Sequence, residues 1–166
     1  RSAFNLHRFC ISENGVWTLG DVAPLPKSPC ISSDIINKLQ SLDVVFPCLH
    51  GPFGEDGTMQ GFLEILKIPF VGCSHTPSAI CMDKALTKKL VQAKGLNVAP
   101  FIDFSLAEWD ANQALCLDRM HSKLSFPLYI KPVHLGSSIG VKKVKTLPEA
   151  ISAIEQAFAL DNHVLI

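Results

Sequence analysis

The chain has 166 residues, which suits one ordinary domain or two small lobes. Its composition is 48% hydrophobic and 18% charged, and this excludes an intrinsically disordered chain, which has low hydrophobicity and high net charge. Because 15 basic residues balance 15 acidic residues, there is no electrostatic reason to expect a nucleic acid or a membrane as partner, although a local group of lysines can still bind a nucleotide.

The first part of the chain predicts an α/β lobe with a parallel sheet. The apolar run 43–49 has strand length and resembles strands covered on both faces, although Pro47 favours a sheet edge. A glycine-rich turn, a helix and another strand follow, and this order is typical of parallel sheets. The predicted elements are a strand region 4–19 with a turn at 13–15, an extended connector 20–31, a helix capped by Ser32 or Ser33 with Ile35, Ile36 and Leu39 on one face, a strand 43–49, a helix 58–67 and a strand 69–73.

The second part predicts helices alternating with strands. Its predicted elements are a helix 77–94 that starts at Thr76-Pro77 and stops at Gly95, a strand 98–104, a helix opened by a capping box at Ser105, strands 127–133 and 140–145 joined by a Gly/Ser loop (134–140), a helix opened by a capping box at Thr146, and a last strand 163–166. The strand–loop–strand hairpin differs in character from the first part. We therefore place a lobe boundary near 74–78, between domains 1–76 and 77–166.

The six cysteines are dispersed and contain no C-x-x-C pair, so neither a disulfide framework nor a zinc site is indicated. We interpret them as reduced thiols that act as small core residues in the cytoplasm. No apolar run approaches the ~20 residues that cross a bilayer, and residues 1–5 lack the apolar core of a signal peptide. Since the chain starts without Met and stops within an apolar stretch, we expect a fragment of a longer protein.

The strongest candidate site is the loop from His50 to Thr58, which follows a predicted strand and precedes a helix. In open α/β sheets, ligands bind beyond the carboxyl ends of strands, and glycines let the backbone approach a ligand closely. The alternative is a tight turn in which Glu55 and Asp56 only cap the next helix. His50, placed beside glycines, is poorly positioned for core packing and could hydrogen-bond a substrate carboxylate or amine.

A second candidate site joins Lys131, at the end of a predicted strand, to the Gly/Ser loop. Backbone N–H groups around Gly136, together with the hydroxyls of Ser137 and Ser138, can converge on phosphate oxygens. The pattern matches neither the P-loop nor the Rossmann fingerprint, because it joins two strands. An ordinary hairpin connection is an equally good interpretation of the loop alone. A Ser–His hydrolase that uses the nearby His134 has little support.

Met82-Asp83-Lys84 on the helix 77–94 is uninformative alone, because most helix lysines are solvated. We interpret the remaining lysines as solvated too: Lys88, Lys89, Lys94, and Lys142, Lys143 and Lys145 on an exposed strand face.

Taken together, these segments resemble the D-alanine–D-alanine ligases. Residues 50–61 read H-G-x-x-G-E-D-G-T-x-Q-G, and the resemblance stays in register from about residue 43 to the end, whereas residues 1–42 agree only loosely. The matching segments that follow in order are Pro69–Gly72, Ser78-Ala79, Met82–Lys84, Val98–Pro100, Ile130–Pro132 and Gly136–Val141. The first segment is specific, whereas the Met-Asp-Lys and Lys-Pro elements are shared more widely among ATP-grasp enzymes.

The resemblance implies an ATP-grasp fold and a reaction in which ATP phosphorylates the carboxylate of one D-alanine and the amine of a second attacks the acyl phosphate, for peptidoglycan synthesis. It implies that Lys84 and Lys131 hold ATP phosphates. Ser137, Ser138 and the backbone at Gly136 would close over the transferred phosphoryl group, so Ser137 is a catalytic and substrate-binding candidate. His50 would lie at the D-alanine site in the same two roles.

The resemblance also implies a cytoplasmic, homodimeric parent protein that uses ATP and Mg²⁺, with the Mg²⁺ ligands outside this chain. We therefore expect the 166 residues alone not to ligate D-alanine. Two alternatives remain: another ATP-grasp carboxylate–amine ligase, and a non-catalytic nucleotide-binding module. The sequence leaves open whether the parent is fused to another enzyme and which second substrate it takes.

Overall fold

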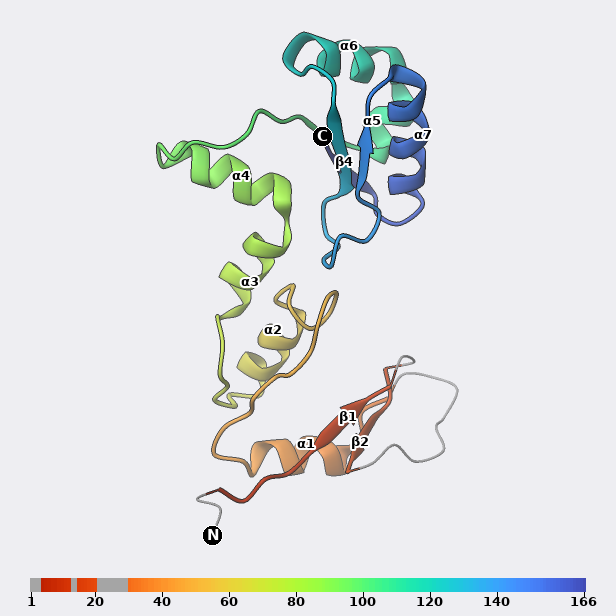
Figure 1. Cartoon of the computed structure of the whole chain (residues 1–166). Helices are drawn as coiled ribbons and strands as arrows, with labels where there is room; N and C mark the ends of the chain where they lie inside the picture. Colours follow the sequence, from red (N-terminus) through yellow and green to blue (C-terminus); the bar gives the residue numbers. More distant parts are fainter. Residues whose placement is uncertain (1–3, 13–14, 21–29) are drawn as a thin grey trace. The chain divides into compact units, whose positions relative to one another are not determined.

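The computed structural model describes residues 4–12, 15–20 and 30–166 (Figure 1). Most of the predicted turn at 13–15 and of the connector 20–31 lies outside these ranges. The chain is a mixed α/β structure, as predicted, and it divides into two compact units. Unit 1 comprises 1–47 and 63–71, and unit 2 comprises 48–62 and 72–166. Within the described part, no helix is both long enough and apolar enough to span a bilayer.

Unit 1 contains a short antiparallel hairpin and one amphipathic helix. Strands β1 (Phe9–Ile11) and β2 (Trp17–Leu19) pair antiparallel within the predicted strand region 4–19. Helix α1 (Ser33–Gln40) begins as predicted, because the Ser32 hydroxyl accepts a hydrogen bond from the backbone N–H of Ile35 at 3.3 Å. Its residues Ile35 and Leu39 are buried and form the apolar face of the helix.

Among the described residues of unit 1, parallel pairing is present only as two isolated bridges, Val16 with Cys30 and Val45 with Phe70. The strands predicted at 43–49 and 69–73 were therefore too long. The backbone N–H of Val45 donates to the carbonyl of Pro69 at 2.8 Å, whereas Pro47 has no N–H with which to continue a ladder. The neighbours of Val45, Val44 and Phe46, are exposed, so this segment is not covered on both faces.

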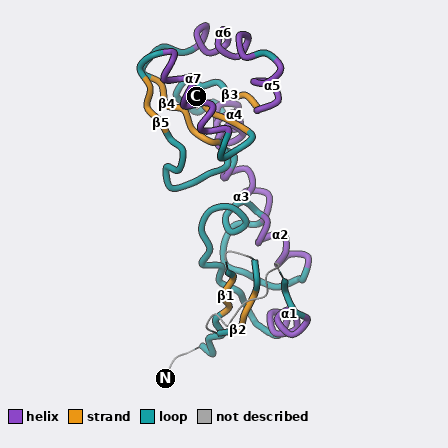
Figure 2. Tube along the Cα trace, turned by 90° about the vertical axis from the view of Figure 1, so that its right-hand side faces the viewer, coloured by secondary structure: helices purple, strands orange, loops and turns teal. Residues whose placement is uncertain are grey.

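Unit 2 is built on a four-stranded antiparallel sheet in the order β3-β6-β4-β5. Its strands are β3 (Asp103–Ser105), β4 (Leu128–Pro132), β5 (Lys142–Val144) and β6 (His163–Leu165). The strands β4 and β5 run side by side in both views (Figures 1 and 2). The predicted strands at 127–133, 140–145 and 163–166 are confirmed, and the one predicted at 98–104 begins later, at Asp103.

Three helices accompany this sheet: α5 (Leu106–Ala111), α6 (Gln113–Lys123) and α7 (Leu147–Phe158). Helix α7 packs against β4, β5 and β6, and its Ala150, Ala153, Ile154 and Ala157 lie in the core. The core of unit 2 includes the fully buried side chains of Phe104, Ile130 and Ile154. Phe104 also stacks on Trp109 of α5, with a centroid separation of 5.6 Å. The core therefore fixes the carboxyl end of β4, where the Gly/Ser loop begins.

Both predicted capping patterns lie at helix starts. The Ser105 hydroxyl accepts from the N–H of Glu108 at 3.2 Å and the Glu108 carboxylate accepts from the N–H of Ser105 at 2.9 Å, which is a reciprocal capping box. At α7, the Thr146 hydroxyl accepts from the N–H of Glu149 at 3.4 Å, but the Glu149 carboxylate accepts from Lys145. The second pattern is therefore a one-sided cap.

The single helix predicted at 77–94 is wrong, because the chain forms two helices there, α3 (His75–Met82) and α4 (Lys84–Ala93). Asp83 separates them with an extended backbone, ψ 102°, and its carboxylate caps α4 by accepting from the N–H of Leu86 at 2.7 Å. An aspartate that bonds the backbone of the following turn competes with helix continuation. The break places Lys84 in the first turn of α4. The helix α2 (Thr58–Ile65) matches its prediction.

All six cysteines are free thiols, as predicted. The expectation that they act as core residues is wrong for most of them, because only Cys116 is buried. The exposed thiols are Cys30, Cys48, Cys73 and Cys81.

Candidate functional site

Lys84 joins the start of α4 to the Gly/Ser loop. Its Nζ donates to the carbonyl of Val133 at 3.0 Å and to the carbonyl of Leu135, and its backbone N–H lies 3.4 Å from the same Val133 oxygen. These contacts connect residues about fifty positions apart in the sequence. The ammonium group therefore holds the loop immediately after β4 and immediately before the two serines.

The position of Lys84 is also electropositive. Burial lowers the pKa of its ammonium group below the ordinary value of 10.5, and the nearby charge of Lys131 lowers it further, against weaker opposing effects of Asp161 and Asp83. Two cations that repel each other favour a bound anion, because its charge offsets the repulsion. The charges of Lys84 and Lys131 thus act on each other, and the role of the two lysines in binding phosphate stays a prediction.

The Gly/Ser loop turns tightly at its centre. The N–H of Ile139 donates to the carbonyl of Gly136 at 3.0 Å, and Ser137 and Ser138 between them have φ values of 50° and 60°. Two successive positive φ angles are typical of a type I′ turn, in which glycine and asparagine are the usual residues. Non-glycine residues held there are strained, and such strain is often found at ligand-binding sites. Both serines are exposed and accessible to a ligand.

The end of the loop is fixed by close packing at Gly140. This residue has φ 71°, and a Cβ atom placed on it would lie 2.7 Å from Cγ of Pro132 and 2.8 Å from Cδ1 of Leu160. Pro132 is buried at the end of β4. The two ends of the Gly/Ser loop therefore meet at Pro132, and only a residue without a side chain fits there.

The carboxylate of Asp161 anchors the start of the loop, a contact that sequence reasoning missed. Its oxygens accept from the backbone N–H of His134 at 2.6 Å and from the N–H of His163 at 3.2 Å, and they lie 2.9 Å and 3.1 Å from Nδ1 of the His134 ring. The Asp161 side chain is only 6% exposed. Among the described residues, no hydrogen bond joins the His134 ring to Ser137 or Ser138, so a Ser–His pair gains no support. The 27-residue separation left no local signal for this contact.

The Asp161 carboxylate stays charged to a lower pH than an ordinary aspartate, because its pKa is lowered. Burial raises its pKa, but hydrogen bonds and the charge of His134, together with the N–H of His163, outweigh burial, so the net pKa lies below the ordinary value of 3.8. A carboxylate with a depressed folded-state pKa stabilises the fold fully above its unfolded pKa, and this stabilisation is lost as the pH falls through the folded pKa.

We therefore expect the free energy of unfolding to decrease as the pH falls below about 4, with Asp161 contributing to the loss. Asp161→Asn should lower stability at neutral pH by about 1–3 kcal/mol and flatten the acid branch of the pH dependence. Urea unfolding followed by circular dichroism across this range tests it. Asp118→Asn, on an exposed position of α6, is the control for removing one charge. An acid branch that is as steep in Asp161→Asn as in the wild type would contradict the assignment.

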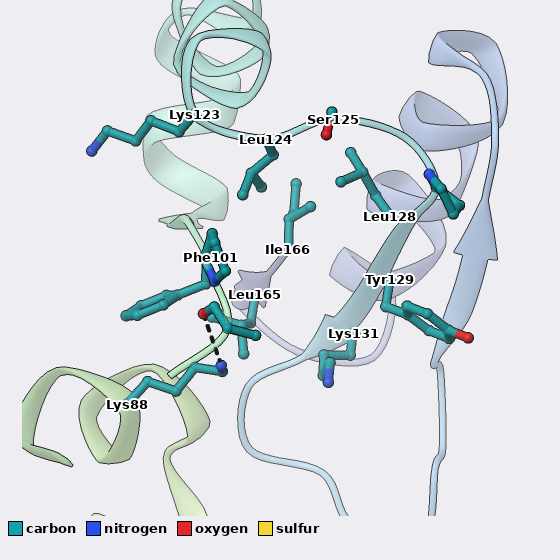
Figure 3. A pocket seen from close by; sticks show the side chains of 13 residues that line it. Lys88, Phe101, Lys123, Leu124, Ser125, Leu128, Tyr129, Lys131, Leu165 and Ile166 are labelled. Carbon is teal, nitrogen blue, oxygen red and sulfur yellow. Dashed lines mark hydrogen bonds between the residues drawn. The ribbon is translucent and has the colours of Figure 1, made fainter. Parts of the chain in front are cut away.

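A cavity of about 430 Å³ lies beside Lys131 and contains three lysines, Lys88, Lys123 and Lys131 (Figure 3). Its remaining lining is largely apolar or aromatic, and includes Phe101, Tyr129, Leu165 and Ile166. Lysines next to flat apolar side chains suit a ligand that carries both phosphate and an aromatic base.

Sequence reasoning missed two lysines of this cavity: Lys123, which no pattern singled out, and Lys88, which was expected to be solvated. The Nζ atom of Lys88 donates to the carbonyl of Ala99 at 3.3 Å and lies 5.1 Å from the centroid of the Phe101 ring (Figure 3). Burial, and then the charge of Lys131, lower its pKa. Its spacing of one helical turn from Lys84 was the only available signal. Lys142, Lys143 and Lys145 are exposed, as predicted.

The loop 50–58 is held by its own acidic residues. The Glu55 carboxylate accepts from the N–H of Gly51 at 2.5 Å, and the Asp56 carboxylate accepts from Phe53 at 2.7 Å and from Thr58 at 3.0 Å. Burial raises the pKa of Asp56, but these backbone hydrogen bonds outweigh burial and the net pKa is lowered. Glu55 and Asp56 therefore shape the loop, and of the two only Asp56 also bonds the start of the next helix, at Thr58.

His50 is exposed at the start of this loop. Across the described ranges, it makes no hydrogen bond or ion pair with the lysines or serines above, so its substrate role stays a prediction. The loop nevertheless shares a cavity with the Gly/Ser loop. Pro52 and Asp56 line a space of about 620 Å³ together with His134, Leu135 and Asp161. Parts of both loops therefore border one cavity within unit 2, although neither His50 nor the two serines line it.

No group of three or more His, Cys, Asp or Glu side chains that could hold a metal ion occurs in 4–12, 15–20 or 30–166. The use of Mg²⁺ stays a prediction.

Comparison with known proteins places the chain in a family. The family model "D-ala D-ala ligase N-terminus" matches residues 1–73, and "D-ala D-ala ligase C-terminus" matches residues 90–166. The chain belongs to the D-alanine–D-alanine ligase family. The α/β architecture of unit 2 is accordingly of the ATP-grasp type found in this family, as the resemblance implied.

Relatives in the family include free-standing and fused proteins. The bifunctional enzyme MurC/Ddl of Chlamydia pneumoniae is 40% identical over 98% of this chain and 21% of its own length. The D-alanine–D-alanine ligase of Natranaerobius thermophilus is 34% identical over 97% of this chain and 50% of its own length. Among solved structures, the VanG D-Ala:D-Ser ligase of Enterococcus faecalis has 35% identity and a TM-score of 0.69, over 97% of this chain and 42% of that chain. The chain thus spans at most about half the length of these family members.

Proposed function

We propose that the protein carrying this chain joins two D-alanine molecules in an ATP-dependent reaction through an acyl phosphate, as a step of peptidoglycan precursor synthesis. Two observations carry the proposal. The ammonium group of Lys84 holds the carbonyls of Val133 and Leu135 just before the Gly/Ser turn, and the nearby charge of Lys131 lowers its pKa. Lys131 also lines a basic and aromatic cavity. The D-alanine–D-alanine ligases among the relatives of the chain support the identity of the substrates.

The chemistry requires the features that unit 2 combines. A carboxylate is a poor electrophile until one of its oxygens becomes part of a phosphate leaving group, and the transferred phosphoryl group needs cations and N–H donors around it. Lys84 and Lys131 supply charge, while Ser137 and Ser138 supply exposed hydroxyl donors. The cavity beside Lys131 offers Phe101 and Tyr129 as surfaces for an adenine base. His50 is proposed to contact the D-alanine carboxylate or amine.

Nucleotide binding is the first expected outcome. ATP at about 100 times its Kd should stabilise the protein by about 2.7 kcal/mol, measured as a thermal shift. Lys131→Met should abolish most of this shift, because the methionine keeps the length of the side chain and loses its charge. Lys142→Met is the matched control, since Lys142 is exposed on β5 and pairs with Ile130, the neighbour of Lys131 on β4. Equal ATP shifts in Lys131→Met and in the wild type would contradict the proposal.

The second substrate has one alternative that a specific observation favours. VanG, which matches nearly the whole chain, is a D-Ala:D-Ser ligase. Release of ADP from ATP by the full-length protein that carries this chain, with D-alanine alone or with D-alanine plus D-serine, and mass analysis of the dipeptide, separate the two. All kinetic measurements use this full-length protein, because the 166 residues alone are not expected to ligate D-alanine. No ADP release with either amino acid would support another ATP-grasp ligase, and nucleotide binding without turnover of any acid would support a binding module.

Two further properties belong to the same proposal. A reaction that consumes ATP and a chain with six free thiols both fit the cytoplasm. The homodimer implied by the family stays a prediction.

A further inference from the structure

The segment just before the two serines is held from two sides. On one side, the ammonium group of Lys84, which has only donors, donates to the carbonyls of Val133 and Leu135. On the other, the carboxylate of Asp161 accepts from both the backbone N–H and the ring of the residue between them, His134. Backbone and side chain of His134 are thus bonded to a single group, which fixes both its main-chain direction and its rotamer.

Asp161 is itself well fixed. It lies between the end of α7 and the start of β6, is almost fully buried, and also accepts from the N–H of His163. His163 in turn contacts Asp103 of β3 at 3.0 Å, and Asp103 pairs with Lys89 of α4 at 2.7 Å. A chain of charged contacts therefore links the loop to β6, β3 and α4. Positions held by such networks move little, which is a requirement for placing reacting groups.

The Nε2 edge of the His134 ring, opposite Nδ1, also has a polar neighbour. Its Nε2 lies 3.5 Å from the carboxylate of Asp83, which caps α4, and the ring of His163 lies 6.3 Å away in an edge-on arrangement. The ring is 43% exposed and borders the 620 Å³ cavity. His134 therefore touches the groups that hold the loop and does not contact the phosphate-binding lysines directly.

We propose that His134 and Asp161 are positioning residues for phosphoryl transfer, which set the place of Ser137 and Ser138 through the start of the Gly/Ser loop. The inference rests on the proposed function. Because the lysines supply most of the attraction for ATP, displacing the loop should lower kcat more than it raises KM for ATP. A displacement of about 1 Å at such a site costs on the order of 10²-fold in rate.

Two amide substitutions separate the two nitrogen atoms of the ring. His134→Asn places an N–H donor near the position of Nδ1, where Asp161 accepts, whereas His134→Gln places it near Nε2, which faces Asp83. We expect His134→Asn to keep kcat within about threefold of the wild type, and His134→Gln and His134→Ala to lower kcat by about tenfold or more, with KM for ATP changing by less than about threefold. The thermal midpoint of each variant is measured in parallel.

A double-mutant comparison then tests whether the two residues act together. The kcat loss of His134→Ala combined with Asp161→Asn should be smaller than the product of the two single losses. Equal kcat in the wild type, His134→Gln and His134→Ala would overturn the inference. The inference would also be overturned if His134→Asn and His134→Gln lost the same kcat and each loss matched the decrease in thermal midpoint. Such a result would indicate a purely structural role. A wild-type protein that neither binds ATP nor releases ADP would instead contradict the proposed function itself.

Discussion

Replacing Lys84 by Met is expected to lower kcat/KM for ATP by about 10²–10³-fold, the loss typical when one charged or hydrogen-bonding group is removed from a transition state. The substitution takes away a cation beside Lys131 and also the donor for the carbonyls of Val133 and Leu135. Those carbonyls then lose a charged partner, so the free energy of unfolding should fall by about 1–3 kcal/mol. Steady-state kinetics and urea unfolding measure the two effects.

Two further variants show which effect dominates. Lys94→Met removes an exposed lysine at the end of the same helix and is expected to leave both quantities near the wild-type values. Lys84→Arg keeps the charge, but its planar guanidinium group reaches the two carbonyls with a different geometry. Partial recovery of ATP binding with little recovery of kcat would indicate that the loop contacts matter for the reaction. A Lys84→Met protein with wild-type kcat/KM would exclude Lys84 from the site.

Local signals in the sequence predicted several helix starts and one hairpin correctly. Capping serine and threonine residues define helix starts through contacts over three or four residues, so Ser32, Ser105 and Thr146 could be identified directly. The hairpin around the Gly/Ser loop was likewise visible, because Gly and Ser turn residues separate two segments of strand length. Such contacts depend on neighbours in the sequence and little on the rest of the fold.

The predictions that failed depended on distant partners. The apolar run 43–49 has the composition of a buried strand, but strand length is decided by the partner, and Val45 pairs only with Phe70. The helix 77–94 was predicted to be continuous from its start at Thr76-Pro77 to its stop at Gly95, whereas the carboxylate of Asp83 caps a new helix and also contacts His134. Single-sequence patterns contain no information on the pairing of Val45 with Phe70 or on the contact with His134.

The same dependence on sequence separation explains why only part of the candidate site was predicted. Lys131 and the serines are close in sequence, so their association could be expected from the hairpin alone. Lys84 was included only through the family resemblance, and the structure supplies the physical link, a side chain that bonds loop carbonyls 49 and 51 residues away. Lys88 and Asp161 had neither a local pattern nor a motif, and only the folded arrangement brings them to the site.

Replacing Gly140 by Ala is expected to destabilise the protein by about 2–4 kcal/mol and to lower kcat, because the loop is fixed at this residue. A left-handed backbone costs a non-glycine residue about 1–2 kcal/mol, and forcing a methyl group against Pro132 and Leu160 adds about 1–3 kcal/mol. Pro132 cannot yield easily, since it is buried in the same strand that carries Lys131.

Gly95→Ala is the matched control, because Gly95 has a similar φ of 79° with nothing within 4 Å of the added Cβ. The decrease in the free energy of unfolding of Gly95→Ala measures the backbone cost alone. The difference between the two variants in urea unfolding measures the packing cost. Equal losses in both variants would show that the loop end is free to move, and the turn carrying Ser137 and Ser138 would then not be held in place from this side.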